Sequence, residues 1–256
     1  MGKKVFFASD FHLGAEATLS SLDREKNIVR WLTSVQHEME ALYLVGDIFD
    51  YWFEYKCCIP KGFTRFLGKM AELRDAGIPI FFFTGNHDMW MFDYFEKEFD
   101  IPVYHKPIQR QIHGKNFFIG HGDGLGPSDH GYKIIKKIFS NKFCQWAYAR
   151  LHPNFGLWLM KKFSNKSRDV GGDNSKFLGR DNEFLVLYAE KKLEDQEIDY
   201  FIFGHRHLPL KVHLEAKESI YFGLGDWTHY QSYGVLEDGV FSLKYFEQPD
   251  MTKVIE

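Results

Sequence analysis

Cysteine is scarce in this chain of 256 residues: there are three, of which Cys57 and Cys58 are adjacent and Cys144 is far away. This spacing fits neither a disulfide framework nor a zinc ribbon, so it predicts a protein of a reducing, cytosolic compartment. The chain also lacks any run of about 18 uncharged apolar residues, so no membrane-spanning helix is predicted and only peripheral membrane contact remains. The start, Met1 to Phe6, carries no signal-peptide or myristoylation pattern, so no leader is expected.

Net charge is also small, at −3 with histidine counted as neutral. Domains that bind nucleic acid are usually strongly basic, so no nucleic-acid partner is predicted. Apolar residues make up 45% of the chain and aromatic residues 18%, which is ample for a sizeable core. The chain is therefore predicted to be a folded globular protein in which any charge signal is local.

Five short apolar runs each end in a turn that carries polar side chains. The runs cover residues 5–8, 41–45, 78–83, 115–120 and 200–203. Segments 22–38 and 63–76 have helical apolar spacing, and Gly77 supplies a stop. The first third is thus predicted to be β-α-β-α-β with parallel strands, whose polar turns gather at one edge of the sheet. After His207, short segments at 210–214, 219–222, 232–236 and 240–246 favour an antiparallel second sheet.

One segment differs from the rest in charge. From His130 to Arg168 there is no Asp or Glu, while Lys and Arg recur among large apolar side chains such as Trp146 and Trp158. We interpret it as helices inserted between the run at 115–120 and a helix at 182–193. Two readings stay open: an ordinary amphipathic pair with solvated lysines, or a surface for an anionic and apolar partner.

The polar turns contain the residues of a metal site. The candidate ligands are Asp10, His12, Asp47, Asn86, His121, His205 and His207. Imidazole and carboxylate with one amide oxygen suit Mn, Fe or Zn, whereas a structural zinc site is normally rich in thiolates. Seven ligands are too many for one ion, so two ions are predicted, bridged by a carboxylate.

The charges of such a site indicate its substrate. Two divalent ions carry four positive charges, and the ligands Asp10 and Asp47 return only two negative ones. The remaining positive charge favours an anionic substrate such as a phosphoester. Two ions about 3.5 to 4 Å apart stabilise the oxygens of an in-line displacement, so hydrolysis at phosphorus is the predicted reaction class.

The pattern D-x-H, G-D, G-N-H-D, a later H and G-H-x-H resembles the calcineurin-like metallophosphoesterase superfamily over roughly residues 3–225. The resemblance implies an α/β fold of four layers, α-β-β-α. It implies one metal held by Asp10, His12, Asp47 and His207, and another held by Asp47, Asn86, His121 and His205. It further implies that His87 acts at the leaving oxygen and is oriented by Asp88, although His87 could instead only order its loop.

A closer resemblance comes from the segments 46–52, 121–132 and 163–167, which look like the UDP-2,3-diacylglucosamine diphosphatase family of lipid A synthesis. That family uses two manganese ions to release UMP and an acylated sugar 1-phosphate, and its inserted helical lid holds the acyl chains. The resemblance implies a single domain over residues 1–256, a lid insertion at about 128–182, and peripheral contact with the inner membrane. The implied substrate-binding residues are Asn86, Asp129, Tyr132, Asn165 and Lys166.

The sequence departs from that family at His87, where well-known members carry Arg. Arg clamps phosphate as a permanent cation, while His can also donate a proton. The departure leaves open a different lipid-linked or nucleotide diphosphate as substrate. A phosphodiesterase or phosphatase for soluble substrates is the second hypothesis. A non-catalytic scaffold on the same fold is the third hypothesis, although none of the expected ligand positions is vacant.

Overall fold

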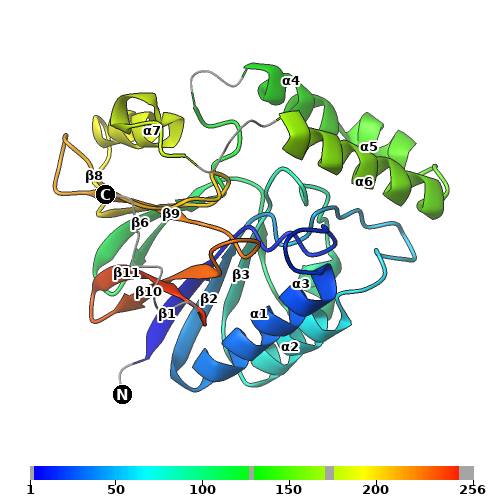
Figure 1. Cartoon of the computed structure of the whole chain (residues 1–256), viewed down its shortest axis with the longest axis horizontal. Coiled ribbons are helices and arrows are strands. Elements are labelled where there is room, and N and C mark those ends of the chain that lie inside the picture. Colours follow the sequence, from blue (N-terminus) through cyan, green and yellow to red (C-terminus); the bar gives the residue numbers. More distant parts are fainter. Residues whose placement is uncertain (1–2, 127–129, 171–175, 248–256) are drawn as a thin grey trace.

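A computed structural model describes residues 3–126, 130–170 and 176–247 of the chain. Two β-sheets pack face to face, and helices cover the outer face of each (Figure 1). Both sheets contain parallel and antiparallel neighbours. The predicted four-layer α-β-β-α fold is therefore confirmed.

The first sheet is built mainly from the first third of the chain. Its strands are β1 (Lys4–Ala8), β2 (Met39–Val45), β3 (Ile80–Phe83), β4 (Val103–Tyr104), β10 (Ser232–Glu237) and β11 (Val240–Tyr245). Their order is β11-β10-β1-β2-β3-β4, and β1 to β4 run parallel. The prediction of parallel strands for this part is confirmed.

The outer face of this sheet is covered by α1 (Ser21–Val35) and α2 (Thr64–Asp75). The 3-10 turn η1 (Gln36–Glu38) extends α1, and α3 (Tyr94–Phe99) follows β3. The Ser20 side chain accepts a hydrogen bond from the Asp23 N–H at 3.1 Å, which caps α1. Gly77 has a φ of 78° just beyond α2, as expected of the predicted stop.

The second sheet contains β5 (Ile108–Ile112), β6 (Lys115–Gly120), β7 (Tyr200–Phe203), β8 (Pro209–His213) and β9 (Ile220–Leu224). Their order is β5-β6-β7-β9-β8. The 3-10 turn η2 (Arg180–Asn182) precedes α7 (Phe184–Leu193), which covers the outer face. The prediction that the last four segments form one antiparallel sheet was wrong: β10 and β11 extend the first sheet, and β9 pairs parallel with β7.

Strand side chains alternate between two of the three core layers. In β1, Phe6 packs on the helix side, whereas Phe7 lies between the sheets, where its ring is 5.9 Å from that of Phe117. Because successive side chains of a strand point to opposite faces, a strand buried on both faces reads as a continuous apolar run. This explains why the predicted runs lacked alternation.

Between β6 and β7 the chain forms α4 (His130–Phe139), α5 (Lys142–Tyr148) and α6 (Pro153–Val170), together called the insert. These helices lie side by side, away from the strands of both sheets (Figure 1). None of the helices in the described ranges is long and apolar enough to cross a membrane.

Candidate metal centre

The candidate ligands all follow strands whose carboxyl ends point the same way within their sheet. Asp10 and His12 follow β1, Asp47 follows β2 and Asn86 follows β3, and these strands are parallel. In the second sheet, His121 follows β6, and His205 and His207 follow β7, which is parallel to β6. The two sheets therefore deliver ligands from opposite sides to one place.

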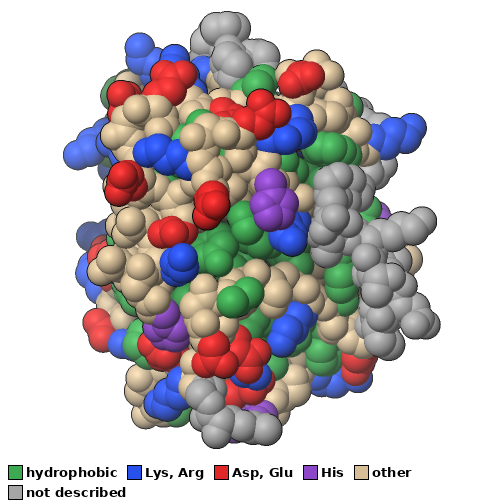
Figure 2. Space-filling view, turned by 90° about the vertical axis from the view of Figure 1, so that its left-hand side faces the viewer, with side chains coloured by type: hydrophobic (Ala, Val, Ile, Leu, Met, Phe, Trp, Pro, Cys, Tyr) green, Lys and Arg blue, Asp and Glu red, His purple; other side chains and the backbone are tan. Residues whose placement is uncertain are grey.

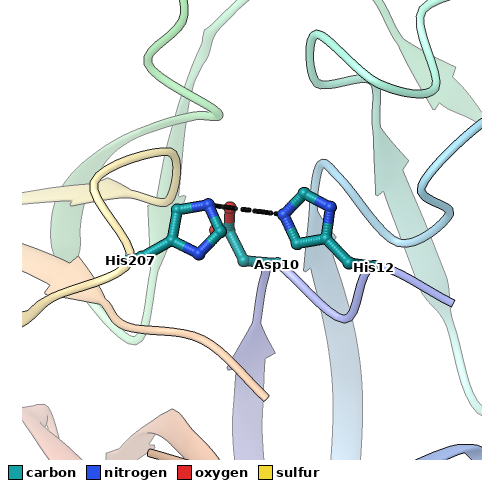
Figure 3. Close-up of side chains that lie close together, drawn as sticks. All are labelled: Asp10, His12 and His207. Atoms are coloured by element: carbon teal, nitrogen blue, oxygen red, sulfur yellow. Dashed lines mark hydrogen bonds and ion pairs between the residues drawn. The ribbon is translucent and has the colours of Figure 1, made fainter. Parts of the chain in front are cut away.

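Asp10, His12 and His207 form the first group (Figure 3). His207 Nε2 lies 3.3 Å from His12 Nε2 and 3.3 Å from Asp10 Oδ1, and the two imidazole rings stack at 4.9 Å. Two ligands at right angles, each about 2.1 Å from one ion, lie about 3 Å apart. The spacing of these atoms is thus suited to a shared cation.

Asp47, Asn86, His121 and His205 form the second group. Asn86 Oδ1 lies 3.3 Å from His121 Nε2 and 3.0 Å from His205 Nδ1, and Asp47 Oδ2 lies 3.2 Å from His121 Nε2. The same Asp47 oxygen is 3.8 Å from His12 Nε2 of the first group. Asp47 therefore lies between the two groups, as a bridging carboxylate would.

The backbone at these ligands is unusual. Asp10, His12, Asp47, His205 and His207 all have positive φ, between 44° and 66°. This conformation is uncommon for residues with a Cβ and persists where the surrounding structure enforces it, often at functional sites.

Glycines next to the candidate ligands allow the loops that carry these ligands to approach one another closely. A Cβ on Gly46 would lie 2.5 Å from His121 Nδ1, and one on Gly85 would collide with the Asp47 carboxylate. Gly204 likewise lies against Ser9 and Asp10. The sheets could not bring the ligands this close with larger residues at these positions.

The electrostatics also suit cations. Burial lowers the pKa of His12, but the carboxylates of Asp10 and Asp50 outweigh burial and raise that pKa to about 10. Burial also lowers the pKa of His121, and Asp47 raises it to about 10. Asp10 Oδ1 is buried without a hydrogen-bond partner. This concentration of negative charge, together with an unsatisfied carboxylate oxygen, is the environment that a divalent cation would neutralise.

Several outer residues fix the orientation of the ligands. His121 Nδ1 lies 2.9 Å from the Val45 carbonyl oxygen, and His207 Nδ1 lies 3.1 Å from Asp226 Oδ2. A carbonyl or carboxylate at Nδ1 holds the hydrogen there and leaves Nε2 as the free ligand atom. Burial raises the pKa of Asp226, but hydrogen bonds from His207 and His229 bring it well below its usual range, so it stays charged.

Sequence reasoning missed Asp226, although a signal was present. Gly225 and Asp226 directly follow β9, just as Gly46 and Asp47 follow β2. Because β9 is parallel to β7, its carboxyl end reaches the same edge of the sheet. The signal was lost because β9 was assigned to an antiparallel sheet.

Two buried arginines were also missed. Arg24 is fully buried and donates to the backbone oxygens of Phe11, His12, Ala15 and Leu19, so it holds the loop after β1. Arg206, between two ligands, donates to both carboxylate oxygens of Glu183 at 3.0 and 2.9 Å. This bidentate pair ties the loop after β7 to the start of α7.

The expectation that Asp88 orients His87 differs from the contacts of these two residues. Asp88 accepts hydrogen bonds from the backbone N–H groups of Gly85, Asp47, Ile48 and Phe49, so it joins the loops after β2 and β3 rather than orienting His87. His87 Nδ1 instead lies 3.1 Å from the Asp50 carbonyl oxygen and 3.0 Å from Ser164 Oγ. His87 remains beside the site, grouped with His12 and Asp47.

Of the expected substrate contacts, only Asn86 can be placed. Asp129 lies outside the described residues, and so do the side chains of Tyr132, Asn165 and Lys166. One insert lysine has an acidic partner in the core, since Lys136 Nζ lies 2.5 Å from Asp123 Oδ2. Part of the insert's positive charge is thus neutralised within the protein.

Comparisons with known proteins show the family of the chain. Residues 3–209 match the calcineurin-like phosphoesterase family. The chain is 38% identical over 261 residues to a UDP-2,3-diacylglucosamine hydrolase of Porphyromonas gingivalis, covering 96% of this chain and 99% of that one. It is 29% identical over 236 residues to the Photobacterium profundum hydrolase of the same name, covering 89% and 91%. A solved phosphoesterase from E. coli has a TM-score of 0.49 and 15% identity over 98% of this chain and 97% of that one.

Proposed function

The chain belongs to the calcineurin-like phosphoesterase family, and from this premise we propose that it hydrolyses the pyrophosphate bond of UDP-2,3-diacylglucosamine, a step of lipid A synthesis. The products would be UMP and the acylated sugar 1-phosphate. The observation that carries this proposal is the similarity to the P. gingivalis hydrolase, which extends over nearly the whole of both chains. Membership of the family also makes the chain a metal-dependent hydrolase.

Two divalent ions, Mn by preference, would occupy the centre. Asp10, His12, Asp47 and His207 would hold one, and Asp47, Asn86, His121 and His205 the other. Support comes from the donor spacing and from the ligand types, which lack the thiolates of a structural zinc site. When bound, the ions would lower the pKa of water and stabilise the oxygens of the displacement at phosphorus.

The surrounding residues would position the substrate phosphates and the ligands. Burial lowers the pKa of His87, so its ring is neutral in the metal-free protein. Among the described residues, the hydrogen-bond partners of this ring lie at Nδ1, which leaves Nε2 for the leaving oxygen of the substrate. Asn86 would contact the phosphates next to its ion, and Asp88 would hold the loops that carry Asp47 and Asn86.

The insert would be a lid, at about residues 128–182 of a single domain, that holds the acyl chains and rests on a membrane. Its exposed aromatic side chains are Phe143, Trp146, Phe155, Trp158 and Phe163. Arg150 lies 5.0 Å from the Trp146 ring and Lys162 lies 5.4 Å from the Trp158 ring. Aromatic rings beside cations suit the interface of an anionic membrane.

Charge distribution supports this assignment of the insert. The face shown in Figure 2, on the side of α7 and β11, mixes acidic and basic side chains, whereas the insert has no acid from His130 to Arg168. The proposal includes work in the cytoplasm, with the insert in peripheral contact with the inner membrane. Asp129, Tyr132, Asn165 and Lys166 remain the proposed contacts to the sugar and phosphates.

The test is to incubate purified protein and Mn with UDP-2,3-diacylglucosamine, or with UDP-N-acetylglucosamine as the unacylated control, and to measure UMP. We expect rapid release of UMP from the acylated substrate alone, and none after metal is removed with a chelator. Equal rates on both substrates would overturn the lipid assignment and favour a soluble nucleotide diphosphate. Release of UDP instead of UMP would place the cleaved bond elsewhere.

A further inference from the structure

A hydrogen bond joins the insert to the ring of His87. Ser164 lies on α6 and is 7% exposed, and its Oγ is 3.0 Å from His87 Nδ1. The preceding residue, Phe163, is 55% exposed. Helix α6 thus turns a small hydroxyl toward the metal centre and an aromatic side chain toward solvent.

The same nitrogen is held from the core by Asp50. His87 Nδ1 lies 3.1 Å from the Asp50 carbonyl oxygen and 3.6 Å from its carboxylate. Both groups only accept hydrogen bonds, so Nδ1 carries the hydrogen, and Ser164 Oγ is a second acceptor for it. Two elements far apart in the sequence therefore define the plane of the ring, and Nε2 projects away from both contacts.

We infer that Ser164 is a positioning residue that orients His87 when α6 is seated over the metal centre. The insert then affects the chemical step as well as substrate binding, since the correct ring orientation depends on its position. This inference rests on the proposed role of His87 at the leaving oxygen.

The first experiment compares full-length Ser164→Ala with the unaltered protein, both loaded with Mn. Loss of one hydrogen bond to the ring should lower kcat on UDP-2,3-diacylglucosamine by about 5- to 10-fold and change KM by less than about twofold. Ser140→Ala is the matched control, because Ser140 is an exposed serine of the same insert whose backbone alone is hydrogen-bonded.

A double-mutant cycle with His87→Ala then separates this inference from its premise. If Ser164 acts through His87, Ser164→Ala should have almost no further effect once His87 is removed. An equal loss of kcat in both backgrounds, or a change in KM alone, would overturn the positioning role. A His87→Ala variant with full kcat would instead overturn the role of His87 itself, whatever Ser164→Ala does.

Discussion

The side chains of the candidate metal centre are mostly buried and held by hydrogen bonds, whereas several large aromatic side chains of the insert are exposed to solvent. Asp10 and His12 are 0% and 2% exposed, and they accept hydrogen bonds from the His205 N–H and from Arg24 of α1, respectively. In the insert, Phe143 is 71% and Trp146 54% exposed. Buried polar groups are specified from within the protein, whereas exposed aromatic groups need a partner to cover them. Under the proposed function, the comparison separates residues that would define the reaction from residues that would choose its substrate.

The two regions also differ in how the chain builds them. The centre collects its seven candidate ligands from turns after five strands of both sheets, so it depends on the whole two-sheet core. The insert is one continuous stretch of chain, and its contacts with the core include Lys136 on Asp123 and the Trp90 Nε1–H that donates to the Phe139 carbonyl. Changes at the centre should therefore affect every substrate, and changes to the exposed aromatic side chains of the insert only some.

The largest expected effect is at the bridging carboxylate. Asp47→Ala should lower turnover of both lipid and small substrates by at least about a thousandfold, because both ions lose a ligand. Measuring UMP release together with bound metal per chain checks this. Asp75→Ala, which removes an exposed carboxylate at the end of α2, should behave like the unaltered protein. Retained turnover with both metals bound would show that Asp47 is no bridge.

The next effect concerns stability. Arg206→Met should lower the free energy of unfolding by about 3 to 5 kcal/mol, since Glu183 would stay buried without its cation. Urea unfolding measured in the presence of a chelator gives this value without a contribution from metal. Arg180→Met removes an exposed pair with Glu190 and Glu215 and should cost less than about 1 kcal/mol. Similar losses in the two variants would contradict the importance of burial.

A smaller effect, on metal affinity, is expected at Asp226, which contacts the candidate ligand His207. Asp226→Asn keeps the shape of the side chain but removes the charge that orients His207, so metal affinity should fall by about 10- to 100-fold. Titration of metal into the metal-free protein measures it. His229→Ala removes the other imidazole on the same carboxylate oxygen and should bind metal normally. If it weakens binding as much, the contact to His207 is not the cause.

The smallest effect tests the insert alone. Replacing Trp146 and Trp158 with Ser should weaken binding to anionic vesicles by about tenfold while leaving turnover of a small phosphodiester unchanged. Vesicle sedimentation measures the binding, and an assay with the small phosphodiester measures the turnover. Val240→Ser, at an exposed apolar residue of β11, should have no effect on vesicle binding. Unchanged vesicle binding in the double variant would refute membrane contact through these rings.

Much of the fold could be predicted because it rests on local patterns. The strands at 115–120 and 200–203 have the predicted bounds, since their apolar runs begin and end sharply. The structure also brings together every metal ligand expected from the turns after the strands. The late strands were misassigned because a short alternating segment does not reveal its partner, and β10 pairs with β1 from the other end of the chain.

By itself, the sequence determined the five strands that lead to the candidate ligands, the types of ligand and the acid-free insert, because these are properties of neighbouring residues. Only the tertiary structure decided that Arg206 pairs with Glu183, that Asp226 orients His207, that Asp88 bonds to backbone rather than to His87, and that Ser164 reaches His87. Each of these contacts joins residues from different elements. Hydrogen-bond partners are chosen by which polar groups burial leaves within about 3 Å of one another, and that is settled only when the two sheets and the insert pack.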